Sequence, residues 1–272
     1  MGKTTEIIIL YLLILLFAVS GRSQCPIEEQ SFQYGEKLTY EVSYNWSFIS
    51  INAGKVTFET DTKIADDKEY FHFISTGKSY SIYNWFYEVN DSLSSVVDTQ
   101  TLSPLEFHRK TSEGNYKVNN SYLFDRNKNI LVSSTQNSKK PLATDTFNLA
   151  PCTFDVLSAV YYIRTLNFSD KTPGHQVVIR FIIDGEFYEI PVKYLDKEII
   201  SNKDNTKYNC IKFSAKLVPG TIFKDGKEIF VWVTDDKNKI PIKVEASILA
   251  GSIKAYLSGY QGLKHDLTSQ IE

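Results

Sequence analysis

Residues 37–46 read KLTYEVSYNW, and this stretch decides the fold class. Apolar side chains occupy every second position, and polar side chains occupy the positions between them. The apolar set is Leu38, Tyr40, Val42, Tyr44 and Trp46, and the polar set is Lys37, Thr39, Glu41, Ser43 and Asn45. Strict period-two alternation is typical of a β-strand that packs one face on a core and leaves the other in water. The stretch therefore predicts a strand of an antiparallel sheet.

Similar segments continue along the chain. Alternation resumes after Ala53-Gly54 with Val56 and Phe58. Further strand-like segments cover residues 70–75, 88–93, 105–110, 116–124, 130–135, 177–183, 186–194, 228–234, 240–249 and 252–257. Turn-forming residues separate them, and Asp184-Gly185 and Asp225-Gly226 are two-residue hairpin signals. Short strands at this spacing predict an antiparallel meander.

Residues 153–167 have helical periodicity instead. Thr153 is the expected N-cap, and Asp155 suits the positive end of the helix dipole. The predicted helix is apolar on most sides, and such a helix is normally buried. We therefore expect an all-β fold with one principal helix. Its curved, mostly antiparallel sheet should form an open or partly closed barrel, with the helix packed into or across it.

The N-terminus predicts export. Lys3 precedes an apolar run, Ile7 to Val19, that is too short as a helix to cross a bilayer core of roughly 30 Å. The run suits a secretory signal peptide, and both Ala18-x-Ser20 and Gly21-x-Ser23 offer the small residues that cleavage needs. We predict a signal peptide over 1–23 and a single β-rich domain over 24–272, without a membrane span in the mature chain. An uncleaved membrane anchor is the alternative.

The three cysteines are Cys25, Cys152 and Cys210. Export permits a disulfide, and we expect the pair Cys152–Cys210, with buried free thiols as the alternative. No C-x-x-C occurs, which excludes a thioredoxin-like site or a zinc ribbon. Lipidation of Cys25 is a further alternative, although Gln24 and Ser23 are unusual residues before a lipidated cysteine.

Composition limits the partners and the chemistry. The formal net charge is −2 and no long run of one sign occurs, so nucleic acid and electrostatic adsorption to anionic lipid are disfavoured. The four histidines have no metal-ligand spacing, no G-x-S-x-G occurs, and no metal, cofactor or catalytic residue is predicted. Asn52-Ala53-Gly54-Lys55 lacks the second glycine of a phosphate loop and predicts a bulge or turn. Asp235-Asp236 could form an acidic site, but its surroundings favour a tight turn.

Several blocks together resemble a known family. They are 35–40 (GEKLTY), 51–56 (INAGKV), 152–159 (CTFDVLSA), 185–188 (GEFY) and 231–241 (VWVTDDKNKIP). The chain resembles the exported bacterial family called domain of unknown function 3108, common in Bacteroidota, over about residues 35–263. The resemblance implies a Gram-negative envelope location, in the periplasm or at the outer membrane. It implies no established activity and no catalytic residues.

Three functions are consistent with these features. A looser, fold-level analogy to periplasmic lipoprotein carriers suggests a non-enzymatic envelope protein that binds a lipid or another apolar ligand on a concave sheet face. The candidate lining residues are Tyr40, Tyr44, Trp46, Phe58 and Trp232, unless they simply fill the core. The second function is a structural or assembly partner of an outer-membrane protein system. The third is an uncharacterised hydrolase built on Asp235, Asp236 and a distant histidine.

Overall fold

A computed structural model describes residues 25–85, 87–216, 227–248 and 251–271 of the chain. The predicted signal peptide and the predicted Asp225-Gly226 turn lie outside the described residues. No helix among the described residues has the length and apolar character needed to cross a membrane.

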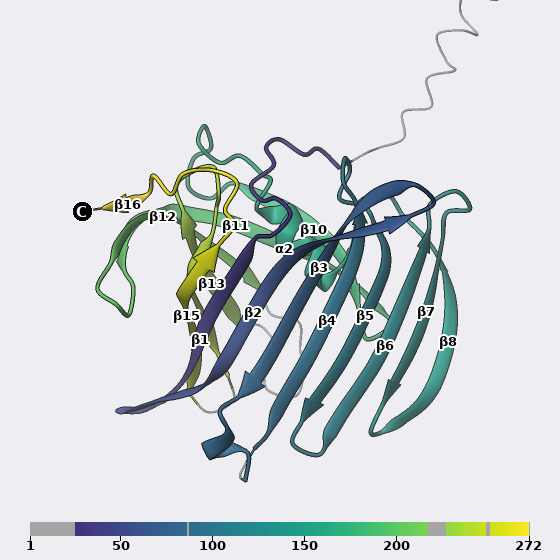
Figure 1. Cartoon of the computed structure of the whole chain (residues 1–272), viewed down its shortest axis with the longest axis horizontal. Helices are drawn as coiled ribbons and strands as arrows, with labels where there is room; N and C mark the ends of the chain where they lie inside the picture. The colour runs from purple at the N-terminus through teal and green to yellow at the C-terminus, as the bar shows by residue number, and fades with distance from the viewer. Residues whose placement is uncertain (1–24, 86, 217–226, 249–250, 272) are drawn as a thin grey trace, which may run out of the picture.

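The described strands form one sheet (Figure 1). The first eight are β1 (Lys37–Trp46), β2 (Ile49–Ala65), β3 (Lys68–Ser79), β4 (Val89–Asp98), β5 (Pro104–Glu113), β6 (Tyr116–Asp125), β7 (Ile130–Asn137) and β8 (Lys140–Asn148). The others are β9 (Thr153–Asp155), β10 (Gln176–Ile183), β11 (Glu186–Ser201), β12 (Lys207–Lys216), β13 (Glu228–Thr234), β14 (Pro241–Ser247), β15 (Ser252–Gln261) and β16 (Gln270–Ile271). Their order is β8-β7-β6-β5-β4-β3-β2-β1-β15-β14-β13-β12-β11-β10-β9, with β16 on β12. Among the described pairs, only β9–β10 is parallel, so the predicted antiparallel meander is confirmed.

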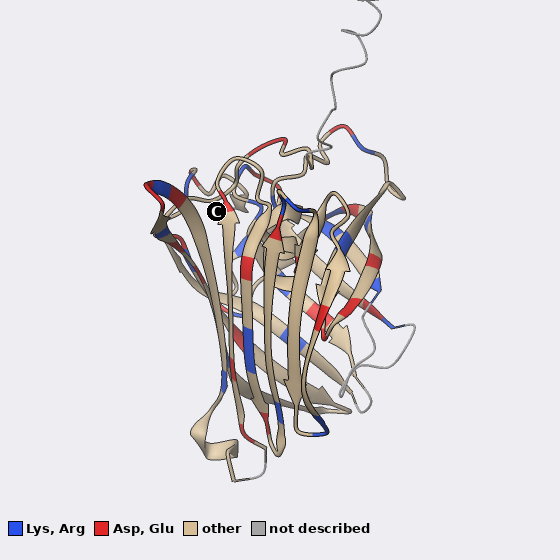
Figure 2. Ribbon diagram, turned by 90° about the vertical axis from the view of Figure 1, so that its right-hand side faces the viewer, with Lys and Arg blue, Asp and Glu red and all other residues tan. Residues whose placement is uncertain are grey.

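The sheet curls until the β10–β11 hairpin returns to the inner side of β5 and β6. Asp184, in the hairpin turn, accepts hydrogen bonds from Arg109 at 2.9 Å and Asn120 at 2.7 Å. The Gly185 N–H donates to the Tyr122 hydroxyl at 3.3 Å. The two ends of the strand order, β8 and β9, are not joined by a ladder. The sheet is therefore a partly closed barrel, as predicted (Figure 2).

Four of the described strands were not predicted from the sequence, and the two longest of them are β8 and β12. β8 is an edge strand that is exposed along nearly its whole length, so it has no alternating apolar pattern. β12 places Cys210 and Ile211 next to each other in buried positions, which breaks the alternation. The predicted irregularity at Asn52-Ala53-Gly54-Lys55 is a bulge, because Val42 pairs with Gly54 while Ser43 pairs with Asn52.

The helix α2 (Val156–Ile163) is shorter than the predicted 153–167. The prediction of Thr153 as N-cap is wrong, because Thr153 belongs to β9 and its backbone is extended to pair with β10. Asp155 is the cap, and its carboxylate accepts from the backbone N–H groups of Leu157 and Ser158, both at 2.9 Å. A short 3-10 helix, η1 (Ser81–Tyr83), lies between β3 and β4.

The helix packs inside the curl and divides the core, as expected from its apolar sides. One face packs on β3 to β7, where the Tyr161 and Phe73 rings stack at 3.7 Å between centroids. The other face packs on β10 to β13, and Tyr162 stacks on Phe154 at 4.5 Å.

A buried ion pair anchors the C-terminal end of α2. Two nitrogens of Arg164 donate to the two carboxylate oxygens of Glu36 at 2.6 and 2.9 Å. Arg164 also donates to the carbonyl oxygens of Ser31 at 3.3 Å and Asn238 at 3.0 Å. Burial alone would lower the pKa of the guanidinium, but the Glu36 carboxylate outweighs it and raises that pKa. The pair joins three segments that are distant in sequence.

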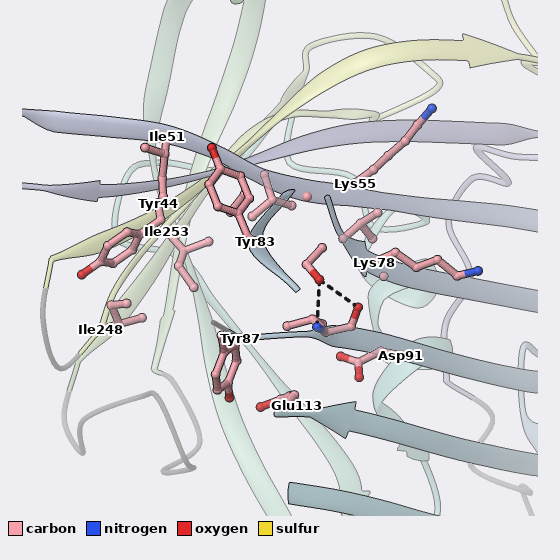
Figure 3. A pocket seen from close by; sticks show the side chains of 17 residues that line it. Tyr44, Ile51, Lys55, Lys78, Tyr83, Tyr87, Asp91, Glu113, Ile248 and Ile253 are labelled. Carbon is pink, nitrogen blue, oxygen red and sulfur yellow. Dashed lines mark hydrogen bonds between the residues drawn. The ribbon is translucent and has the colours of Figure 1, made fainter. Parts of the chain in front are cut away.

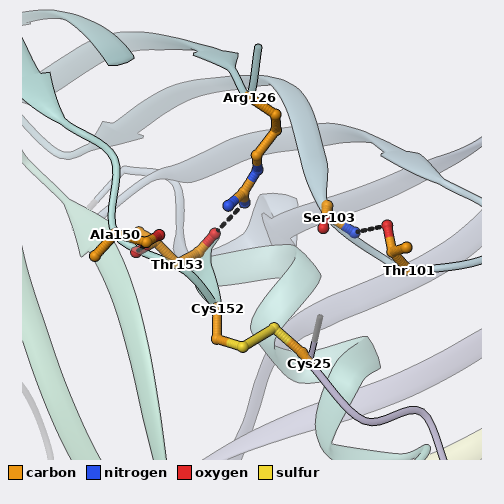
Figure 4. Close-up of a disulfide and its surroundings, with 7 residues drawn as sticks. All are labelled: Cys25, Thr101, Ser103, Arg126, Ala150, Cys152 and Thr153. Atoms are coloured by element: carbon orange, nitrogen blue, oxygen red, sulfur yellow. Dashed lines mark hydrogen bonds between the residues drawn. A yellow bond between two sulfur atoms is a disulfide. The ribbon is translucent and has the colours of Figure 1, made fainter. Parts of the chain in front are cut away.

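A disulfide joins Cys25 to Cys152, with their Cα atoms 5.4 Å apart (Figure 4). The predicted Cys152–Cys210 pair is therefore wrong, and Cys210 is a buried free thiol in β12. Cys152 follows β8 at the turn before β9, where the N-terminal segment crosses α2. The bridge also occupies the Cys25 sulfur that lipidation would need.

Removing the disulfide should destabilise the protein. The bridge spans 127 residues, and a loop of this size is worth about 3–5 kcal/mol of unfolding free energy. Cys25→Ser should lower the stability by this amount in urea denaturation, and reductant should bring the wild type to the same level. Cys210→Ala should keep the response to reductant. A wild type that is indifferent to reductant would contradict the pairing.

Replacing one partner of the Glu36–Arg164 pair should lower the free energy of unfolding more than replacing both partners. Glu36→Met leaves a buried guanidinium without its partner, which costs about 3–5 kcal/mol. The double variant Glu36→Met/Arg164→Met removes both charges and should be more stable than the single variant in urea denaturation. A double variant less stable than Glu36→Met would show that the ion pair is not the reason for the loss.

Candidate ligand-binding cavities

The larger cavity lies on the inner side of β1, β2 and β3, close to η1 (Figure 3). Its volume is about 440 Å³. The wall is mainly aliphatic and aromatic, and includes Val42, Tyr44, Ile51, Val56, Tyr83, Tyr87, Val89, Ile248 and Ile253. Asp91 and Glu113 lie together at one side, whereas the side chains of Lys55 and Lys78 extend away from the cavity. The space is an apolar chamber with one acidic side.

Two glycines shape the wall of this cavity in different ways. Gly54 lies on β2 and Gly77 on β3, each at a position that faces the interior of the barrel. The next inward-facing residues on each strand carry side chains. A Cβ at Gly77 would meet only Val56 Cγ2 at 3.6 Å and Asp91 Cβ at 3.7 Å, which are ordinary contacts. A Cβ at Gly54 would lie 2.3 Å from the Lys78 carbonyl oxygen, so Gly54 is required for the approach of β3. Gly77 instead leaves open volume.

A second cavity of about 320 Å³ adjoins the first, because Val56 lines both. It lies between α2 and the inner face of β1, β2, β13, β14 and β15. Its lining comprises Leu38, Tyr40, Val56, Phe58, Val160, Tyr161, Arg164, Ile229, Val231, Pro241, Val244 and Ala255. The hydroxyl of Tyr40 is buried without a hydrogen-bond partner among the described residues, and burial raises the pKa of this group well above its ordinary value.

The structure brings three of the five predicted lining residues to these cavities. Tyr40 and Phe58 line the smaller cavity and Tyr44 lines the larger one. Trp46 is 57% exposed at the end of β1. Trp232 lies on the opposite face of the sheet, where its indole N–H donates to Glu198 at 2.8 Å.

Sequence reasoning missed several residues that shape the cavities. Val56 was visible in the alternation of its strand, and Gly77 was visible as a glycine inside a strand, where it often marks a close approach or an open space. Val160 lines the smaller cavity only because α2 packs across the sheet. No local pattern identifies that contact.

The acidic candidates are used by the fold. Asp236 accepts from the Asn238 N–H at 2.9 Å and the Lys239 N–H at 3.3 Å, which forms the predicted turn. Asp235 pairs with Lys197 at 2.7 Å. Within the part of the chain that the structure describes, no group of three His, Cys, Asp or Glu side chains could hold a metal ion.

Asp91 gives the larger cavity a titrating group. Burial raises the pKa of its carboxyl to about 6, and repulsion from Glu113 adds to the rise. The Ser112 N–H donates to Asp91 at 3.2 Å and opposes this shift. The Asp91 carboxyl therefore changes from neutral to charged as the pH rises through about 6.

Replacing Asp91 should change how stability depends on pH. The folded-state pKa of Asp91 is raised from 3.8 to about 6, so folding favours the protonated carboxyl. The stability of the fold with neutral Asp91 is fully present below about pH 4 and is lost as the pH rises through about 6. Asp91→Asn should therefore be more stable than the wild type above pH 6, and the difference should vanish near pH 4. Urea midpoints measured across this range check the effect, with Asp67→Asn as a control for net charge. A difference that does not vary with pH would contradict it.

The comparisons with known proteins agree with this fold. Among solved structures, the chain is similar to a beta-barrel-like protein of domain of unknown function DUF1849 from Brucella abortus, with a TM-score of 0.54 and 9% sequence identity. The match covers 87% of this chain and 100% of that one, and at this identity it shows the fold alone. No curated relative matches the chain. The family model described as "Protein of unknown function (DUF3108)" matches residues 39–258. The chain therefore belongs to the DUF3108 family.

Proposed function

We propose that this protein is a non-enzymatic carrier or sensor that binds a lipid, or another apolar ligand with an acyl chain, on the concave face of its sheet. The observation that carries the proposal is the pair of adjoining cavities with a mainly apolar lining. Ligand sites are typically concave and apolar, with a small number of polar groups that orient the ligand. Asp91, Glu113 and the tyrosine hydroxyls supply those groups here.

The length of the space favours a chain-like ligand. The cavities follow β1 from Leu38, in the smaller one, to Tyr44, in the larger one. At ~3.3 Å per residue this distance is roughly 20 Å, which suits an extended acyl chain. Each buried methylene contributes about 0.8 kcal/mol, so such a chain could be held without a strong polar anchor.

Two features support a location in the cell envelope. The apolar run Ile7 to Val19 has the length of a signal peptide core. The Cys25–Cys152 disulfide joins the N-terminal segment to the body of the domain, and disulfides persist in oxidising compartments such as the periplasm. A carrier of apolar ligands would act there between membrane surfaces.

One observation favours the second candidate, an assembly partner of an outer-membrane protein system. β8 is at the end of the strand order and is exposed, so its outer edge could pair with a strand of another protein. Lys140 and Pro141 protect only the start of this edge, because lysine and proline discourage pairing. Capture through β8 would be lost in Thr144→Pro without loss of ligand binding.

Filling the larger cavity should weaken ligand binding. Gly77→Phe directs a ring between Val56 and Asp91, and saturable binding of the probe N-phenyl-1-naphthylamine should fall about tenfold or more. The matched control is Gly259→Phe, because a side chain at Gly259, outside both cavities, meets nothing within 4 Å. Fluorescence titration measures both.

Two results would overturn the proposal. One is the absence of saturable binding by the wild type, for the naphthylamine probe and for fluorescent fatty acids alike. The other is an equal effect of Gly77→Phe and Gly259→Phe. Urea denaturation of each variant separates a filled cavity from an unfolded protein.

A further inference from the structure

Large apolar side chains are exposed at one end of the sheet. The turn between β1 and β2 presents Trp46, Phe48 and Ile49, and the connection between β3 and β4 presents Ile82, Trp85 and Tyr87. Phe48 is 94% exposed, Trp85 86% and Ile82 69%. We call these six residues the apolar rim. Large apolar side chains exposed together at one end of a protein often mark a contact site.

The rim surrounds the end of the larger cavity. In an antiparallel meander, alternate turns lie at the same end, so the β1–β2 and β3–β4 connections are neighbours at the lower end in Figure 1. Tyr44 of β1 and Ile51 of β2, close to the turn that joins these strands, belong to the cavity wall, as do Tyr83 and Tyr87 of the β3–β4 connection. A surface that meets the rim therefore also meets the cavity.

The charge pattern of this end matches a lipid interface. Asn45–Ser50 and Ser79–Trp85 contain no charged residue, although 23% of the chain is charged. Lys139, in the β7–β8 turn, and Lys140, the first residue of β8, are exposed at the same end of the sheet. Three carboxylates lie near the rim, those of Asp91 and Glu113 in the cavity wall and that of Glu88 just before β4. Tryptophan and tyrosine are enriched where apolar chains meet headgroups, and lysines are attracted to anionic headgroups.

We propose that the apolar rim docks the protein on a lipid bilayer, with the larger cavity facing the membrane. The net charge of −2 gives no long-range attraction to the membrane, so insertion of Phe48, Ile82 and the two tryptophans supplies the binding free energy. Docking does not require the cavity to hold a lipid. The exchange of lipid between cavity and membrane rests on the proposed function.

The test is flotation with vesicles of phosphatidylethanolamine and a minority of phosphatidylglycerol. The wild type should float with the vesicles in high salt, because the anchors are uncharged. Phe48→Ser/Ile82→Ser should bind about tenfold more weakly or worse. The matched control is Ile64→Ser/Leu123→Ser, whose residues are 69% and 53% exposed towards the opposite end of the sheet, and it should float like the wild type.

Native tryptophans report insertion directly. Trp46 and Trp85 belong to the rim, and the third tryptophan of the chain, Trp232, is buried. Brominated acyl chains should therefore quench emission in the wild type, and Trp46→Phe/Trp85→Phe should abolish the quenching. Gly77→Phe should still float, which separates docking from ligand binding in the cavity.

Three outcomes would overturn the proposal. The first is a wild type that does not float, and the second is equal flotation of the rim and control variants. The third is that the wild type forms a dimer, and that Phe48→Ser/Ile82→Ser dissociates this dimer but leaves flotation unchanged. That result would assign the rim to a contact between two copies of the chain.

Discussion

The buried contact between Arg164 and Glu36 is the constraint on which the arrangement of the interior depends. Arg164 follows α2, Glu36 precedes β1, and the Asn238 carbonyl in the β13–β14 turn accepts from the same guanidinium. A buried charge must be paired and hydrogen-bonded, so these three segments have to meet at one point. Phe32 and Tyr161 pack on the guanidinium at 5.4 and 5.6 Å. The contact therefore fixes where α2 ends and how it crosses the sheet.

The position of the helix explains why the interior is not filled evenly. α2 has eight residues and, at ~1.5 Å per residue, spans only about 12 Å, whereas the strands around it are longer. It fills the interior beside β3 to β7 and β10 to β13 with aromatic contacts. Along β1 and β2 the inner face extends past the helix, and Gly77 adds no side chain there. The two cavities lie in the space that the helix does not fill.

The two ends of the barrel are built differently. At one end the N-terminal segment is held by the Cys25–Cys152 disulfide and by Arg164, and the C-terminal residues pack beside it, where the His265 carbonyl accepts from Asn238 at 2.9 Å. At the other end, the β1–β2 turn and the β3–β4 connection carry the apolar rim, and the larger cavity lies next to them. One end of the barrel is therefore covered by described residues of the N- and C-terminal segments, and the other end carries exposed apolar side chains beside a cavity.

The sequence by itself determined the fold class and the presence of one principal helix, because hydrophobic periodicity and local turn chemistry are short-range properties. β1 is predicted residue for residue, and the turn at Asp184-Gly185 is where it was expected. The sequence did not determine the disulfide partner of Cys152, the start of α2 after β9, or which strands are edges, since each depends on residues far apart in the chain. The same holds for the site. Alternation selected Tyr40, Tyr44 and Phe58, but only the curl of the sheet and the crossing of α2 decided that they line cavities and that Trp232 faces away.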